Sequence, residues 1–258
     1  MAEYQNWDKK SESKAVDILL KNGGTLVSPT KVGYIIMASD FKGLERKFEV
    51  KKRKKNKPGV VLCSSLEQLS LISEINEEIE NFYKSHWDRD ILIGCILPWS
   101  EKGKTLIPKD GARTLMMDTR DTSCFVIKFG RPSENIARTL WDRHKKLVFA
   151  SSANPSGIGN KGQVSNIGQK IAEGVDFIIE ADDYVRSIQP RESEDTRYEQ
   201  GVMVSMVDGN GKLVPQQKSR RNISPAPRLI RKGLDNDLVM SILSQCFESW
   251  DYRQGDYY

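Results

Sequence analysis

The chain has 258 residues, of which 29% are charged, with a formal net charge of +5 and a mean hydropathy of −0.53. These values are typical of one soluble globular domain, and no apolar run approaches the roughly 18 residues that a membrane span requires. The N-terminus also lacks the apolar core of a signal peptide, so we expect a cytoplasmic protein that does not bind membranes.

Cysteines and histidines are few and scattered. The four cysteines have no metal-ligand spacing, and the two histidines are His86 and His144. We therefore predict no metal-binding residues and no Ser-His-Asp catalysis, so any chemistry has to use other side chains. No feature of the sequence indicates an oligomeric state.

Apolar periodicity and turn residues predict the secondary structure along the chain. In chain order, the first half contains a helix at 11–22, strands at 24–30 and 34–39, a helix at 41–53, a strand at 58–65, a helical stretch in two pieces at 65–87 and strands at 91–99, 114–119 and 124–130. The second half contains a helix at 133–144 with Ser133 as N-cap, a strand at 147–151, a helix at 165–174, strands at 175–181, 201–208 and 227–233 and a helix at 235–247.

Helices and strands interleave in this pattern without strict alternation. The order predicts an α/β fold in which a single-domain, twisted mixed sheet is flanked by helices. Two charged or proline-containing segments, 182–200 and 216–227, are predicted to be long loops or lids.

Positive charge is concentrated in one segment. Residues 42–57 contain nine Lys or Arg and two Glu. This segment fits either a solvated helix face that continues into a nucleic-acid-binding patch, or an arm that binds polyphosphate.

Residues 151–157, with the sequence SSANPSG, follow an apolar run that is predicted to be a strand. In open α/β sheets ligands bind at the carboxyl ends of strands, where small polar residues allow a backbone to approach a phosphate closely. The same residue types are common in ordinary turns, so the segment alone allows both interpretations.

Several short motifs in chain order together resemble the YrdC/Sua5 family of threonylcarbamoyl-adenylate synthases, as a divergent member. The matching residues are Pro29, Thr30 and Tyr34, Lys51 and Arg53 with Pro58, Ser152, Ala153 and Asn154 with Ser156 and Gly157, Ser205 with Asp208, and Arg231 with Gly233. The resemblance implies a YrdC-like nucleotide-binding domain at 11–245 and a C-terminal tail at 246–258.

The resemblance also implies a reaction. Enzymes of this family combine ATP, bicarbonate and L-threonine into threonylcarbamoyl-AMP and pyrophosphate, the first step toward the t6A modification of tRNA. Such a nucleotidyltransferase needs no nucleophile of its own, because it positions its substrates and neutralises phosphate charge. Mg²⁺ is expected on the ATP phosphates, with few or no protein ligands.

By the same resemblance, particular residues receive roles. Lys51 and Arg53 are the expected catalytic residues. The expected ATP-binding residues are Lys51, Arg53, Lys57, Ser152, Asn154 and Arg231. The expected amine-binding residues are Thr30, Lys31, Tyr34, Lys128 and Ser205, although either Lys128 or Arg131 could be the counterpart of the family's strand-end Arg.

The departures from the family pattern cluster where the amine is expected to bind. Lys31 and Val32 replace an acid and a Thr, Gly33 precedes Tyr34 where the family has a Gly after the Tyr, and Met206 replaces another Thr. This pattern would arise if adenylate chemistry were retained while the amine changed. We therefore expect L-threonine to be a poor substrate, and an amine with an anionic group that Lys31 could contact to be a better one.

Three function classes stay open on the sequence. The first is the nucleotidyltransferase, which makes threonylcarbamoyl-AMP or an analogue with another amine, including carbamoyl-adenylate chemistry in a biosynthetic pathway. The second is a module that binds double-stranded RNA or tRNA through the basic segment. The third is a catalytically silent relative that acts as a partner or regulator.

Overall fold

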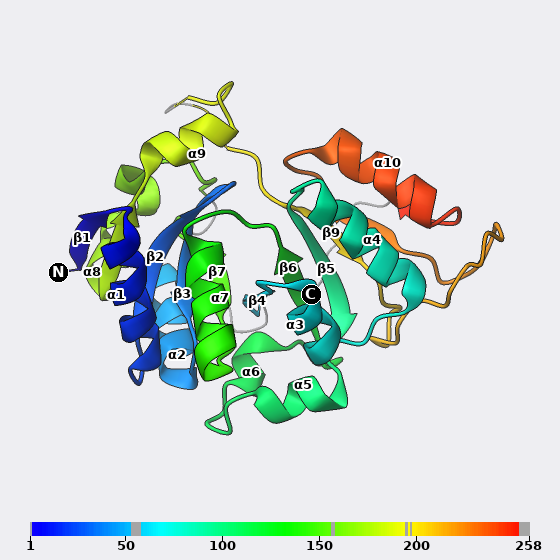
Figure 1. Ribbon diagram of the computed structural model, residues 1–258, viewed down its shortest axis with the longest axis horizontal. Helices are drawn as coiled ribbons and strands as arrows, with labels where there is room; N and C mark the ends of the chain where they lie inside the picture. Colours follow the sequence, from blue (N-terminus) through cyan, green and yellow to red (C-terminus); the bar gives the residue numbers. More distant parts are fainter. Residues whose placement is uncertain (1, 53–57, 156–157, 194–195, 197, 253–258) are drawn as a thin grey trace.

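A twisted mixed sheet extends through the molecule in the computed structural model, which describes residues 2–52, 58–155, 158–193, 196 and 198–252 (Figure 1). The strands are β1 (Glu3–Asn6), β2 (Thr25–Thr30), β3 (Gly33–Ala38), β4 (Val60–Leu62), β5 (Ile93–Pro98), β6 (Thr122–Ile127), β7 (Phe149–Ser152), β8 (Phe177–Glu180), β9 (Val202–Ser205), β10 (Arg228–Arg231) and β11 (Asp251–Tyr252). Within the described ranges their order is β1-β8-β2-β3-β7-β4-β6-β5-β9-β10-β11.

The sheet contains both parallel and antiparallel neighbours. For example, β3 pairs antiparallel with β2 and β7, whereas β4 pairs parallel with β6. The expected single-domain mixed α/β fold is therefore confirmed.

Helices pack on the sheet both around β2 and β8 and around β5 and β9. They are α1 (Lys9–Leu20), α2 (Phe41–Lys51), α3 (Leu66–Ile72), α4 (Glu77–Asp88), α5 (Glu101–Leu106), α6 (Arg113–Met116), α7 (Ser133–His144), α8 (Gln169–Gly174), α9 (Asp182–Ile188) and α10 (Asn236–Cys246), with a 3₁₀ turn at Val164–Ile167. None of the helices in the described part of the chain combines the length and the hydrophobicity needed to cross a bilayer.

Local sequence signals explain where these helices begin. Asp8, Asp40, Ser65 and Asn76 precede α1, α2, α3 and α4, and each side chain accepts a hydrogen bond from a backbone amide of the first turn. Such N-caps satisfy amides that have no partner inside the helix. The predicted division of residues 65–87 into two helices is confirmed by Ser65 and Asn76.

Two layers of helices bury different parts of the sheet. Helices α1 and α7 contact each other and pack on β2, β3, β7 and β8, whereas α4 and α10 pack together beside β5 and β9 (Figure 1). In the middle of the sheet, Val61 of β4 is paired with Phe125 of β6 and Phe149 of β7, and all three are buried in the larger core cluster. The next residues along these strands face the opposite side.

The structure corrects three predictions of secondary structure. Residues 114–119 do not form a strand: the run lies in helix α6 and the turn after it, because a short buried apolar run fits either element. The N-cap of α7 is Pro132 and not Ser133. The Ser133 hydroxyl instead donates to the carbonyl oxygen of Pro29 (2.7 Å). The segment 182–200 is not entirely a loop, because it begins with helix α9.

Two strands lie outside the predicted 11–245 range. β1 pairs parallel with β8, and β11 pairs parallel with β10, so residues before 11 and after 245 extend the sheet at its two edges.

Candidate functional site

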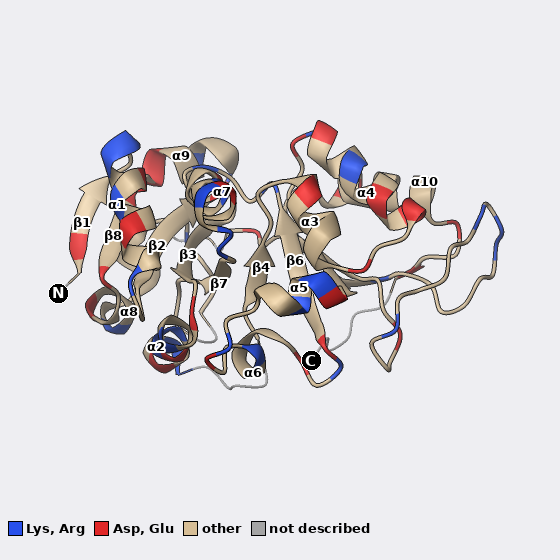
Figure 2. Cartoon of the chain, turned by 60° about the horizontal axis from the view of Figure 1, so that its bottom comes forward, with Lys and Arg blue, Asp and Glu red and all other residues tan. Residues whose placement is uncertain are grey.

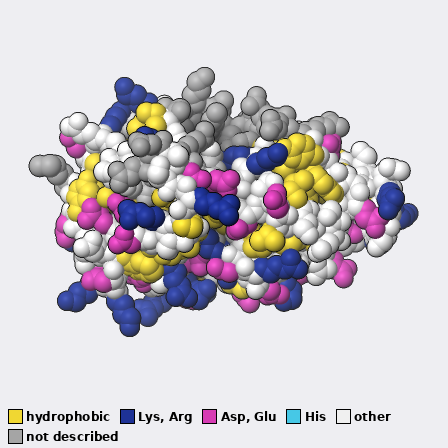
Figure 3. Space-filling view, turned by 90° about the horizontal axis from the view of Figure 1, so that it is seen from above, with side chains coloured by type: hydrophobic (Ala, Val, Ile, Leu, Met, Phe, Trp, Pro, Cys, Tyr) yellow, Lys and Arg dark blue, Asp and Glu magenta, His cyan; other side chains and the backbone are white. Residues whose placement is uncertain are grey.

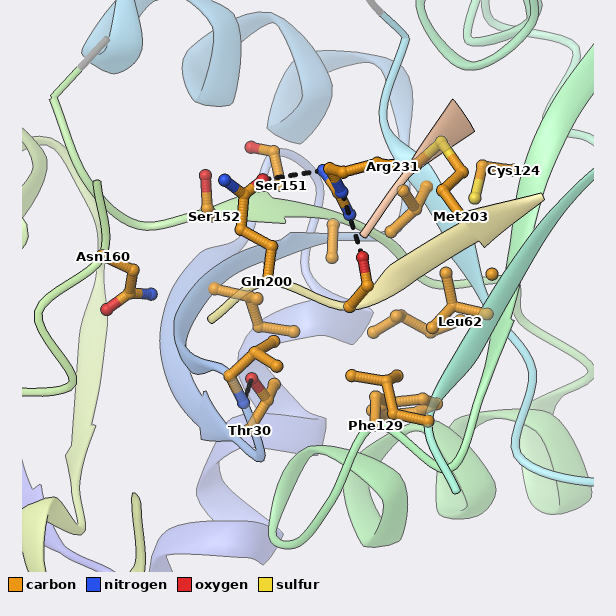
Figure 4. A pocket seen from close by; sticks show the side chains of 18 of the residues that line it. Thr30, Leu62, Cys124, Phe129, Ser151, Ser152, Asn160, Gln200, Met203 and Arg231 are labelled. Atoms are coloured by element: carbon orange, nitrogen blue, oxygen red, sulfur yellow. Dashed lines mark hydrogen bonds between the residues drawn. The ribbon is translucent and has the colours of Figure 1, made fainter. Parts of the chain in front are cut away.

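A cavity of about 200 Å³ lies on the face of the sheet where β3, β7, β4, β6 and β9 contribute residues (Figure 4). In β4 and β6, alternate residues form its floor: Val60 and Leu62 from the first strand, Cys124 and Val126 from the second. This follows from the two-residue period of a strand, since the residues between them belong to the core on the other face. The floor of the cavity is therefore apolar.

Polar side chains lie on one side of this cavity. Ser151, Ser152, Gln200 and Arg231 lie together at one end in Figure 4, opposite Phe129. The predicted segment after β7 thus borders a cavity at the carboxyl end of a strand, where α/β sheets usually bind ligands.

Lys51 and Ser152 are brought together by the fold, although 101 positions separate them. Lys51 ends helix α2, and its Nζ donates to the carbonyl oxygen of Ser152 and to its Oγ (3.1 Å). The Lys51 side chain is buried, which is uncommon for a lysine without a specific role. Two residues predicted to bind ATP are therefore hydrogen-bonded to each other; Ser152 lines the cavity, and Lys51 lies behind it, outside the lining.

Arg231 reaches the same cavity from the far end of the chain. Its Nη1 donates to Oε1 of Gln200 (2.9 Å) and its Nε to the carbonyl oxygen of Gly201 (3.0 Å). Gly233 permits this arrangement, because a Cβ there would lie 1.9 Å from the carbonyl oxygen of Gln200. The predicted Arg231 and Gly233 pair thus positions a guanidinium beside the cavity.

Asn154 also lines the cavity. Its Nδ2 donates to the carbonyl oxygens of Pro155 (3.1 Å) and Ile158, while its Oδ1 has no hydrogen-bond partner among the described residues. Arg53 and Lys57, the remaining residues predicted to bind ATP, lie outside the described residues.

Thr30 and Tyr34 line the cavity, but their hydroxyls form hydrogen bonds with other groups of the protein. Thr30 Oγ1 donates to the carbonyl oxygen of Gly33 (2.6 Å). The Tyr34 hydroxyl donates to Asp182 and accepts from the Ala181 amide (2.9 Å), and burial raises the pKa of this phenol. The Thr30 hydroxyl therefore stabilises the turn after β2, and the Tyr34 hydroxyl links β3 to the start of α9.

Lys31 and Lys128 do not line the cavity. Lys31 Nζ is 2.8 Å from Oδ2 of Asp90, and Lys128 Nζ is 3.4 Å from Oδ1 of the same carboxylate. Lys128 also lies over the ring of Trp87, with Nζ 4.2 Å from its centroid. The prediction that these lysines contact the amine is not supported, because neither lines the cavity and both are paired with the single carboxylate of Asp90.

Ser205 and Arg131 are also absent from the lining of the described cavity. Ser205 is buried in β9, and its hydroxyl donates to the carbonyl oxygen of Val207 (3.1 Å). The Arg131 side chain is exposed, and its amide donates to the Tyr184 hydroxyl (3.0 Å). The choice between Lys128 and Arg131 therefore has no basis in contacts with this cavity.

Sequence reasoning did not identify Gln200, Asn160 or the aliphatic floor. Asn160 is buried, and its Nδ2 donates to the carbonyl oxygen of Tyr34 (3.2 Å). Gln200 lies in a charged segment without apolar periodicity, so nothing in the sequence indicated that it lines a cavity. The aliphatic floor gave none either, because cavity-lining and core residues of a strand have the same composition.

Comparisons with known proteins concern the family and the fold. A family model for Sua5, YciO and YrdC proteins, described as "Telomere recombination", matches residues 18–193. No curated protein matches the sequence significantly.

The solved structures that are similar to this chain include the following three. The hypothetical protein smu.1377c from Streptococcus mutans UA159 is 54% identical with a TM-score of 0.93, and each chain is covered completely. Sua5 of P. abyssi, in complex with L-threonine, is 19% identical with a TM-score of 0.64, covering 97% of this chain and 62% of its own. YciO of E. coli is 18% identical with a TM-score of 0.63, covering 91% and 97% respectively. The latter two likenesses concern the fold.

Proposed function

Because the chain belongs to the Sua5/YciO/YrdC family, we propose that it is a nucleotidyltransferase that forms a carbamoyl-adenylate from ATP, bicarbonate and an amine. The product is threonylcarbamoyl-AMP or an analogue with another amine. The observation that carries the proposal is that Ser152 and Arg231 line one cavity, with the Lys51 ammonium hydrogen-bonded to Ser152.

These residues suit phosphate oxygens. Arg231 has a planar fork of donors that can bind two oxygens at once, and Lys51 adds a point charge held by Ser152. ATP binds as its Mg²⁺ complex, and its phosphates would contact Arg231, which lines the cavity. We assign Lys51 and Arg231 to charge neutralisation at the phosphates.

The reaction then has two steps. The amine nitrogen attacks the carbon of carbon dioxide derived from bicarbonate, loses a proton to solvent and becomes a carbamate. A carbamate oxygen attacks the α-phosphorus of ATP, the bond to the bridging α–β oxygen breaks, and pyrophosphate leaves. Holding the two anions together is the main task of the protein, since positioning alone removes much of the barrier.

No protein nucleophile is required, and the thiol beside the cavity does not suit that role. Burial raises the pKa of the Cys124 thiol to about 12, although the nearby Arg231 opposes the shift. At neutral pH the thiol is therefore protonated and only weakly nucleophilic.

The test is pyrophosphate release with ATP and bicarbonate, measured with each of the twenty amino acids and common amines. We expect release that needs all three substrates, and Arg231→Gln should raise the KM for ATP about tenfold or more, because a charged hydrogen bond is lost. Arg228→Gln is the matched control, since Arg228 lies on the same strand outside the described cavity lining. Absence of release with every amine would refute the proposal.

RNA binding alone is the competing proposal, and the described part of the basic segment gives it little support. Arg46 makes a two-pronged ion pair with Asp176 (2.7 and 2.9 Å), while Lys47 and Lys51 are buried. Acidic residues also lie among the basic residues of α2, and Figure 2 shows both charges on this helix. On the face seen in Figure 3, basic and acidic side chains are mixed in the middle, and basic ones gather along the lower left edge. Salt-sensitive retention of tRNA without ATP-dependent pyrophosphate release would favour this alternative.

A further inference from the structure

We infer that the amine in this reaction carries an aliphatic or aromatic side chain, which the apolar end of the cavity binds. The inference rests on the proposed function and replaces the expectation of an anionic amine. It follows from the size of the cavity, the chemistry of its walls and the ion pairs of Lys31.

The size of the cavity fits an amino acid better than a nucleotide. Its volume is about 200 Å³, whereas sites for drug-sized ligands are roughly 300–1,000 Å³. The nucleotide would therefore lie across the polar rim, near Lys51 and Arg231, and the cavity behind the rim would hold the smaller partner.

The walls away from the polar rim are hydrocarbon. Val32 contributes to the same packed cluster as Leu92 and Phe129, and all three line the cavity together with Ile35 and Leu62. Val32 and Ile35 are only half-buried, although Ile35 lies in the middle of the sheet. Apolar side chains exposed inside a cavity are stabilised when an apolar ligand covers them.

At the apolar end of the cavity, near Val32 and Phe129, no described side chain has a hydroxyl or amide that lacks a hydrogen-bond partner. The Thr30 hydroxyl already donates to Gly33 and accepts from the Val32 amide (3.2 Å). Val32 itself stands where the resembled family has a hydroxyl-bearing Thr. A hydroxyl on the amine's side chain would therefore lose its hydrogen bonds to water without finding a partner here.

An anionic side chain is disfavoured for a related reason. Lys31, the nearest candidate partner, is bonded to the carboxylate and the carbonyl oxygen of Asp90 and does not line the cavity. An incoming carboxylate would have to displace Asp90 before it could reach the ammonium.

The reacting end of the amine would face the polar rim. Ser152 and Arg231 line the cavity there, and a guanidinium can bind the carboxylate or carbamate of an amino acid through paired hydrogen bonds. The Ser151 hydroxyl is not the contact, because Ser151 pairs with Ile36 and faces the other side of the sheet, where its oxygen is buried. The ligand would thus present its polar end to Arg231 and its apolar end to Val32.

The experiment compares kcat/KM for leucine, isoleucine and phenylalanine with that for threonine, serine and glutamate, at saturating ATP and bicarbonate. We expect the best apolar amino acid to exceed threonine at least tenfold, the usual discrimination for one or two buried methylene groups. Val32→Thr, which conserves volume, should reduce that ratio roughly threefold or more without changing the KM for ATP. Ile35→Thr should act in the same direction.

Val164→Thr is the matched control, because Val164 is a half-buried valine outside the described cavity lining; its ratio should equal that of the wild type. Preference of the wild type for threonine, serine or glutamate would overturn the inference while leaving the proposed function intact. An equal rise in the KM for ATP with every amino acid in Val32→Thr would also overturn it, by placing the adenine base on the apolar floor. Pyrophosphate release with none of the amines would instead refute the proposed function.

Discussion

At the scale of single residues, Gly33 holds the turn between β2 and β3 against the segment that contains Asn160. Its φ is +95°, and a Cβ there would lie 2.2 Å from Oδ1 of Asn160. Both the backbone conformation and the close approach therefore require glycine. Asn160 in turn binds the carbonyl oxygen of Tyr34, so this contact shapes the cavity wall.

We predict that Gly33→Ala lowers the free energy of unfolding by about 1–3 kcal/mol, the usual cost of a strained backbone conformation. Gly209→Ala is the matched control, because its Cβ would meet no atom within 4 Å, and it should change stability by less than about 0.5 kcal/mol. Urea denaturation of both variants measures the difference. Equal stabilities would mean that the turn relaxes freely around a side chain.

The sequence indicated several residues that lie in or beside the cavity, but it did not indicate which residues their side chains contact. The order of the motifs agrees with the contact between Lys51 and Ser152 and with the presence of Ser152 and Arg231 in one cavity lining, whereas the roles of these residues stay predictions. The ion pair of Lys31 could not be predicted, because Asp90 is 59 positions away and joins it only through the tertiary fold. A charge in a motif is thus no guide to its partner.

At the scale of elements, helix α4 carries a buried titratable group on its packed face. His86 is fully buried against Phe82, whose ring centroid is 4.3 Å away, and its Nδ1 bonds the carbonyl oxygen of Phe82 (2.7 Å). Nε2 has no hydrogen-bond partner among the described residues. Burial lowers the pKa of His86 from 6.5 to about 4.

This depressed pKa predicts a loss of stability in mild acid. Below pH 6.5 the unfolded chain binds a proton at His86 that the folded protein does not bind until about pH 4, so the free energy of unfolding falls across this window. From pH 7 to pH 5 we expect a loss of about 2 kcal/mol by linkage, measured by urea denaturation.

His86→Asn, which keeps a hydrogen-bonding group near Nδ1, should remove most of this pH dependence. His144→Asn is the matched control, because His144 lies exposed at the end of α7. An unchanged pH dependence in His86→Asn would show that another group causes it.

Helices and strands could be predicted where an apolar pattern extends over many residues. They could not be predicted where contacts with distant segments determine the structure. The helices predicted at 11–22 and 133–144 form, the first of them at 9–20, because their apolar faces are well defined. Residues 114–119 gave no such face, and tertiary packing selected a helical turn. The edge strands β1 and β11 contain mostly polar residues, so only their pairing with β8 and β10 defines them.

At the scale of the whole molecule, Asp90 joins three segments that are distant in sequence. It follows α4 and binds Lys31 after β2 and Lys128 after β6. Partial burial alone would raise the pKa of Asp90. The neighbouring Lys31 ammonium nevertheless holds this pKa below its ordinary value. This cluster connects both parts of the sheet beside the apolar end of the cavity.

We predict that Asp90→Asn lowers the free energy of unfolding by about 1 kcal/mol, a modest value because the Asp90 side chain is 66% exposed. Asp88→Asn is the matched control, since Asp88 makes only a surface pair with Lys84 in the described structure, and it should cost a few tenths of a kcal/mol. Thermal unfolding at low salt provides the comparison. Equal effects would show that the cluster does not couple the segments.

The most direct test of the central claim is the identity of the product. Purified protein is incubated with ATP, isotopically labelled bicarbonate and leucine or threonine, and the adenylates are analysed by mass spectrometry. We predict an adenylate that contains AMP, the amino acid and the labelled carbon, formed faster with leucine than with threonine. ATP consumption without a labelled adenylate, or no consumption with either amino acid, would contradict the account.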